Sequence, residues 1–182
     1  MNQEYIQNTL QAYVDTIIPQ TPGLAEVYGY IQYYGALDLQ VDEFLLENLE
    51  QQYIPLAEGA AELLNAAATQ WLVDQGLDIQ GSLGTLPPQD RLGAIMLSQL
   101  GQVDTEQLPA EQWRDPSFAS SITSSLLLYT LMGYYSEWSG YGTTRWNPPG
   151  DRILEYFPIS WQQIDYPGPS LGYRVLRTVN IS

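Results

Sequence analysis

Apolar side chains recur every three to four positions along most of the first 136 residues, with polar side chains between them. This spacing puts the apolar residues on one face of a helix, which is then buried against its neighbours. The stripes that predict helices cover residues 5–17, 25–31, 44–54, 56–72, 92–100 and 118–132. The pattern therefore predicts an all-α fold of about six helices.

The helix predicted after Asp115 has the clearest start. Asp115 is a good N-cap, and Pro116 suits the first helical position, where no backbone N–H is needed. The Ser and Thr residues of 117–125 let neighbouring elements approach closely, so we expect this helix to be the central one. The core predicted from the apolar stripes includes Ile17, Leu63, Leu64, Trp71, Ile95, Ile122, Leu126 and Tyr129.

The C-terminal stretch has no helical or strand period. Residues 128–174 hold half of the aromatic side chains, together with many Gly and Pro residues. Disordered segments are poor in aromatic residues because they have no core in which to bury them. We therefore expect one domain over residues 1–182, made of a helical body, 1–136, and an ordered irregular tail, 137–182, packed over it.

The composition excludes much catalytic chemistry. The chain has no His and no Cys, and its six basic residues are all Arg. It therefore lacks a Ser-His-Asp or Cys-His arrangement, a Schiff-base lysine and the usual nitrogen and sulfur ligands of metals. Glu58 and Glu62 lie one helical turn apart and could ligate a metal, but a solvated helix face is the more ordinary role for such a pair. We expect no cofactor and no metal, and a chain that is not itself an enzyme.

The net charge of −15 limits the partners, and no basic residue occurs before Arg91. Because a surface this acidic repels phosphate backbones and anionic lipid headgroups, we expect neither nucleic-acid binding nor direct membrane insertion. No apolar run reaches the length of a membrane span. Because no secretory signal is visible, the chain as written is predicted to be cytoplasmic; the alternative is export or membrane association through a partner.

Short motifs occur near both ends of the chain and together span nearly the whole sequence: Ile18-Pro19, Thr21-Pro22-Gly23, Gly133-Tyr134-Tyr135-Ser136, Gly140-Tyr141-Gly142, Trp161 and Tyr166-Pro167-Gly168-Pro169. In their order and separation they resemble the motifs of the gluconate 2-dehydrogenase subunit 3 family. The resemblance implies an all-helical small subunit without a cofactor of its own. Such a subunit assists the assembly or export of an FAD-dependent (GMC-type) sugar or polyol dehydrogenase, often with a cytochrome c subunit.

Three features depart from the family pattern. The twin-arginine export signal typical of the family is not seen, which weakens the expectation of export. Gly140-Tyr141-Gly142-Thr143 stands where the family has Gly-Gly-Asn, and residues 145–158 look like an insertion. The last two departures leave the details of any partner contact open.

Tyr, Trp and Arg dominate binding hot spots, so the tail is the predicted partner-binding surface. Its candidate residues are Tyr134, Tyr135, Trp138, Tyr141, Arg145, Trp146, Arg152, Trp161, Tyr166, Tyr173 and Arg174. Changing Trp138 or Tyr141 to Ala is expected to weaken a complex by about 1 to 4 kcal/mol while leaving the helices intact. Two alternatives stay open: the rings could stack on sugars in a stand-alone carbohydrate-binding protein, or Glu137 and Asp151 could be the carboxylates of a glycosidase.

Overall fold

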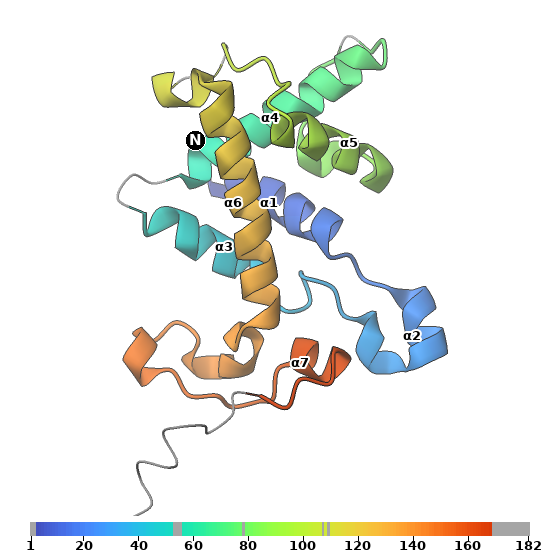
Figure 1. Ribbon diagram of the computed structural model, residues 1–182, viewed down its shortest axis with the longest axis vertical. Coiled ribbons are helices and arrows are strands. Elements are labelled where there is room, and N and C mark those ends of the chain that lie inside the picture. Colours follow the sequence, from blue (N-terminus) through green and yellow to red (C-terminus); the bar gives the residue numbers. More distant parts are fainter. Residues whose placement is uncertain (1–2, 53–55, 78, 107, 109, 169–182) are drawn as a thin grey trace, which may run out of the picture.

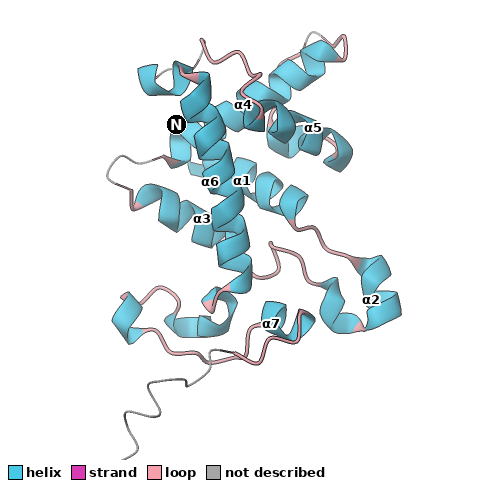
Figure 2. Cartoon of the chain, viewed as in Figure 1, coloured by secondary structure: helices cyan, strands magenta, loops and turns pink. Residues whose placement is uncertain are grey.

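A computed structural model describes residues 3–52, 56–77, 79–106, 108 and 110–168, and these residues contain helices and no strand (Figures 1 and 2). The predicted all-α class is thus confirmed. The α-helices are α1 (Gln3–Ile17), α2 (Pro22–Tyr28), α3 (Val41–Glu50), α4 (Ala57–Asp74), α5 (Pro88–Gln99), α6 (Pro116–Tyr135) and α7 (Ile159–Gln163). Short 3₁₀ helices are η1 (Tyr30–Tyr33), η2 (Leu83–Thr85), η3 (Glu111–Arg114), η4 (Trp138–Thr144) and η5 (Pro149–Asp151).

Helix α6 is central, as predicted. It runs along the long axis of the molecule, and α1, α3, α4 and α5 all pack against it (Figure 1). The side chain of Asp115 accepts a hydrogen bond from the Ser117 backbone N–H at 2.9 Å, which makes it the predicted N-cap. The buried hydroxyls of Thr123 and Thr130 donate to the carbonyls of Ala119 and Leu126 one turn back, so they are satisfied inside the helix.

Most of the predicted core is buried. Leu63, Leu64, Ile95, Ile122 and Leu126 are buried, whereas Ile17, Trp71 and Tyr129 are partly buried and pack against the core. One buried amide crosses this apolar interior: Asn65 donates to Thr9 Oγ1 at 2.9 Å and accepts from the Leu83 N–H at 2.8 Å. Both ends of the amide are therefore paired, and the bonds join α1, α4 and η2.

Several helix boundaries differ from the prediction. The stripe over residues 44–54 corresponds to α3, which begins at Val41 and ends at Glu50. The stripe over residues 25–31 is interrupted at Gly29, whose φ of 100° ends α2 and separates it from η1. Helix α6 continues past Gly133 to Tyr135. A glycine is needed at position 133 because a Cβ would lie 2.6 Å from a ring carbon of Phe44 on α3.

The tail is more regular than its sequence indicates. Its described part, 137–168, contains η4, η5 and α7 and lies across the C-terminal end of α6 (Figure 1). The described part of the tail is thus packed on the helices, as predicted, but it contains short helices that were not predicted. The physical reason is that single helical turns are too short to leave a readable apolar period.

Candidate functional site

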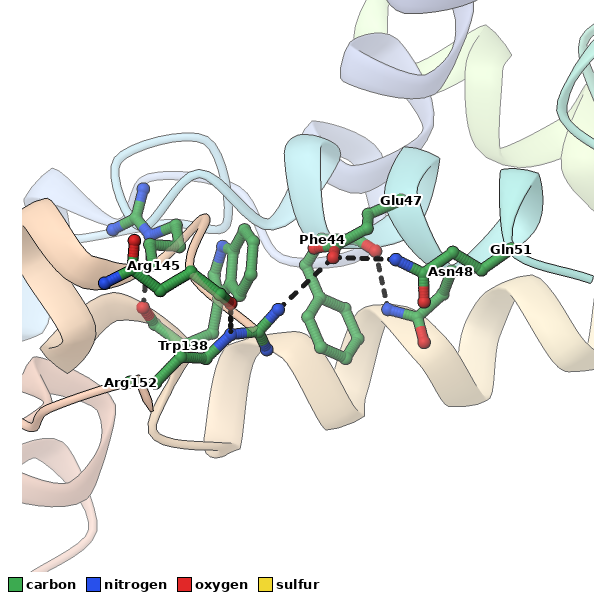
Figure 3. A network of polar contacts seen from close by, with 8 residues as sticks. Phe44, Glu47, Asn48, Gln51, Trp138, Arg145 and Arg152 are labelled. Carbon is green, nitrogen blue, oxygen red and sulfur yellow. Dashed lines mark hydrogen bonds and ion pairs between the residues drawn. The ribbon is translucent and has the colours of Figure 1, made fainter. Parts of the chain in front are cut away.

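Trp138, at the start of η4, holds the tail against α3. Its side chain is only 1% exposed, and its indole N–H donates to the Gln40 carbonyl at 2.8 Å. The ring meets Phe44 edge to face, with 5.4 Å between centroids (Figure 3). It meets Trp146 in the same way at 5.3 Å. A paired N–H and two edge-to-face contacts are the arrangement that a buried indole favours. We call Trp138 and the groups that touch it the tail anchor.

Two arginines complete the tail anchor. The guanidinium carbons of Arg145 and Arg152 lie 5.0 and 5.8 Å from the centroid of the Trp138 ring. Arg152 also forms an ion pair with Glu47 at 3.2 Å (Figure 3). Arg145 Nη1 lies 3.7 Å from Glu43 Oε2. Glu43 and Glu47 are one turn apart on α3, so each faces one arginine of the tail.

Burial changes the acid–base properties of the pair formed by Arg145 and Glu43. Burial lowers the pKa of Arg145, and the negative charge of Glu43 partly opposes this change. Burial also raises the pKa of the Glu43 carboxyl, as does the neighbouring Asp42, whereas Arg145 lowers it. Each group thus compensates for part of the desolvation of the other.

Trp161 on α7 fixes the second half of the tail. It is 3% exposed, and its indole N–H donates to the Tyr135 carbonyl at 2.7 Å. Its ring meets Phe157 and Tyr166 edge to face, at centroid distances of 5.5 and 5.1 Å. Beside it, the hydroxyl of Tyr134 lies 2.6 Å from Gln163 Oε1, which joins α6 to α7. Burial raises the pKa of the Tyr134 phenol.

The structure sorts the predicted binding residues by exposure. Tyr134, Trp138, Arg145 and Trp161 are buried; Tyr141 and Arg152 are half-buried; Tyr135, Trp146 and Tyr166 are exposed; Tyr173 and Arg174 lie outside the described residues. The buried members contact other parts of the same chain, so their role in this structure is to position the tail. Because Trp138 is buried, we expect its truncation to destabilise the fold as well as to weaken any complex.

An exposed apolar face on α6 escaped the sequence analysis. Its leucines, methionine and Tyr135 share one side of the helix. Trp161 connects this side to Tyr166, because its indole N–H donates to the Tyr135 carbonyl and its ring packs on the Tyr166 ring. We call this surface the α6–tail face: Leu127 (38% exposed), Leu128 (57%), Leu131 (38%), Met132 (49%), Tyr135 (44%) and Tyr166 (40%). The sequence did contain one signal for this face, which is that α6 contains no charged residue. A helix of this kind normally has neighbours on every side, so any side left without a neighbour is an exposed apolar surface.

The described residues line two cavities. A polar one of about 390 Å³ lies between α1, η2 and α5 and is lined by the Asp15–Arg91 ion pair. The second, which we call the tail pocket, has a volume of about 300 Å³ and lies between residues 38–40 and the tail. Glu137 and Asp151, the carboxylates of the glycosidase alternative, line neither cavity.

The described part of the chain has no group of three or more His, Cys, Asp or Glu side chains placed to hold a metal ion. Glu62 and its neighbour Glu58 therefore have no further carboxylate beside them that would build such a site. Burial, and then the charge of Glu58, raise the pKa of Glu62. Within the same residues, no helix combines the length and the apolar character that crossing a membrane requires.

Comparisons with known proteins provide no further assignment. The chain matches no family model, no curated protein and no solved structure. The resemblance to the gluconate 2-dehydrogenase subunit 3 family therefore stays a prediction based on the motifs quoted above.

Proposed function

We propose that this chain is a non-catalytic accessory subunit that binds an FAD-dependent (GMC-type) dehydrogenase through the α6–tail face and supports its folding. The observation that carries the proposal is the exposed, uncharged apolar side of α6. Contiguous apolar surface of this kind is characteristic of protein-binding sites. The motif resemblance supplies the class of partner, with a cytochrome c subunit as a possible third component.

The tail anchor supports this role indirectly. A binding surface gains affinity when its side chains are already held in the bound arrangement. Tyr135 and Tyr166 are held in this way, because the Tyr135 ring packs on the buried Tyr134 and the Tyr166 ring packs on the buried Trp161. In this proposal the buried aromatic residues make the surface rigid, and the exposed leucines, Met132 and tyrosines contact the partner.

Charge supports a particular kind of partner surface. The chain carries −15 overall, while α6 itself is uncharged. A partner with an apolar patch surrounded by Lys and Arg would therefore be attracted over a distance and then packed on the apolar face. Self-association through the same face would bring two strongly negative chains together and is disfavoured.

The test uses two methionines of nearly equal exposure, Met132 on the α6–tail face (49%) and Met96 on α5 (47%). The chain is co-expressed with an FAD-dependent dehydrogenase encoded beside it, and soluble, flavin-loaded dehydrogenase is measured. Met132→Lys should abolish co-purification and lower the yield to that found without the chain, whereas Met96→Lys should leave both unchanged.

Two outcomes would remove the proposal. One is an equal yield of active dehydrogenase with and without the chain, with no co-purification. The other is an equal effect of the two lysine variants, which would show that α6 is not the binding surface. Far-UV circular dichroism of both variants controls for loss of the fold.

A further inference from the structure

The tail pocket has features of a ligand site that are independent of the proposed subunit role. Its volume of about 300 Å³ lies at the lower end of the range for small-molecule sites. Its walls include Asp38, Leu39, Arg145, Tyr156 and Phe157. The pocket therefore combines one carboxylate, one guanidinium and two rings, and it is formed where two distant parts of the chain meet.

One residue of the tail pocket has a costly backbone conformation. Gln40 has a φ of 55°, in the left-handed region that residues other than glycine rarely adopt. Gln40 is held by its carbonyl, which accepts from Trp138, and by its side-chain oxygen, which accepts from Arg145. Strained positions that the surroundings hold in place cluster at binding sites.

The polar groups of the pocket offer both donors and acceptors. Arg145 is 7% exposed; its Nε donates to the Trp138 carbonyl, and its Nη1 to Gln40. Arg145 thus brings a guanidinium, a group with five N–H donors, to the wall of the pocket. Asp38 accepts from Gln20 at 2.8 Å and from the Gly35 N–H at 2.8 Å, which leaves lone pairs for further donors.

The local charge selects a neutral ligand. The charged side chains that line the tail pocket are Arg145 and Asp38, and their formal charges cancel, so the lining has no net charge that would favour a free anion or a free cation. Hydroxyl groups both donate and accept, and so match Asp38 and Arg145 together. The rings of Tyr156 (64% exposed) and Phe157 (45% exposed) provide an apolar wall for the C–H face of such a molecule.

We propose that the tail pocket binds a neutral polyhydroxylated molecule, a monosaccharide or a polyol. The site uses Arg145 and Asp38 for hydrogen bonding and the rings of Tyr156 and Phe157 for packing. It lies apart from the leucines and Met132 of the α6–tail face, so a failure to bind sugar would leave the subunit proposal intact, and the reverse also holds.

The test is titration of the full chain with D-glucose and with sorbitol, followed by the amide NMR signals of Leu39 and Gly142. Both signals should shift in a saturable way. Tyr156→Ala should weaken binding about tenfold, whereas Tyr28→Ala, which removes an equally exposed tyrosine (71%) from α2, should not change it.

Three results would overturn the proposal. The first is no shift of either signal at about 50 mM ligand, where a millimolar site would be filled. The second is a shift produced by gluconate and not by glucose, which would make the pocket an anion site. The third is equal weakening by the two tyrosine variants, which would show that the sugar binds elsewhere or non-specifically.

Discussion

Truncation of Trp138 is the sharpest test of how the tail is held. In Trp138→Ala the whole ring is removed from a site that is 1% exposed, and such a change costs about 3 to 5 kcal/mol. The lost hydrogen bond adds little, since the Gln40 carbonyl still accepts from the Phe44 N–H at 3.4 Å. Loss of the ring faces that Arg145 and Arg152 contact adds about 0.5 to 1 kcal/mol. We expect a total near 4 kcal/mol.

The matched control is Trp146→Ala. Trp146 belongs to the same tail and touches the Trp138 ring, but it is 60% exposed. Its truncation should cost about 1 kcal/mol, the value of one edge-to-face pair. The two variants thus separate burial from residue type and from position in the tail.

Urea unfolding followed by far-UV circular dichroism measures both effects. With a slope of about 2 kcal/mol/M, Trp138→Ala should lower the midpoint by about 2 M and Trp146→Ala by about 0.5 M. If Trp138→Ala does not fold, Trp138→Phe keeps most of the ring and should lower the midpoint by about 0.5 to 1 M. Equal midpoints for the Trp138→Ala and Trp146→Ala variants would refute the anchor role of Trp138.

Two further predictions concern helix packing and capping. Gly59→Ala should destabilise the protein by about 1 to 3 kcal/mol, because a Cβ at this position of α4 overlaps the Trp113 ring. Gly23→Ala should stabilise it by up to about 1 kcal/mol, because a Cβ at this position has no atom within 4 Å. The urea midpoints of the two variants measure both effects. Hydrogen bonds from Ser117 lower the pKa of Asp115, so its stabilising effect is present above the unfolded Asp pKa of about 3.9 and is lost as the pH falls through the lower folded value. The midpoint difference between wild type and Asp115→Ala should therefore shrink on acidification; a constant difference would contradict this reasoning.

The burial of the three tryptophans in the tail could not be predicted from the sequence. Trp138, Trp146 and Trp161 are the same residue type in one segment without a period, yet two are buried and one is 60% exposed. Their burial depends on partners far along the chain: Trp138 donates to Gln40, 98 residues away. No local pattern encodes such a contact, so the predicted binding set mixed anchors with exposed residues.

The exposed side of α6 was not predicted from the sequence for a different reason. The apolar stripe of residues 118–132 predicted a central helix, but it did not predict that one side of α6 is exposed. Whether a given face is covered depends on where α3 and α5 cross the helix. The spacing of Leu128 and Met132 places them on one side of α6 but does not say what lies beside that side.

The sequence by itself determined the helical class, the central helix with its Asp115 cap, most of the core and the absence of His, Cys and Lys chemistry. These follow from composition, or from apolar periods and backbone hydrogen bonds that span only three or four residues. The tertiary structure decided which rings anchor the tail, which face of α6 stays open and where the tail pocket forms. Each of these depends on residues brought together from distant parts of the chain, and contacts of that range leave no period in the sequence.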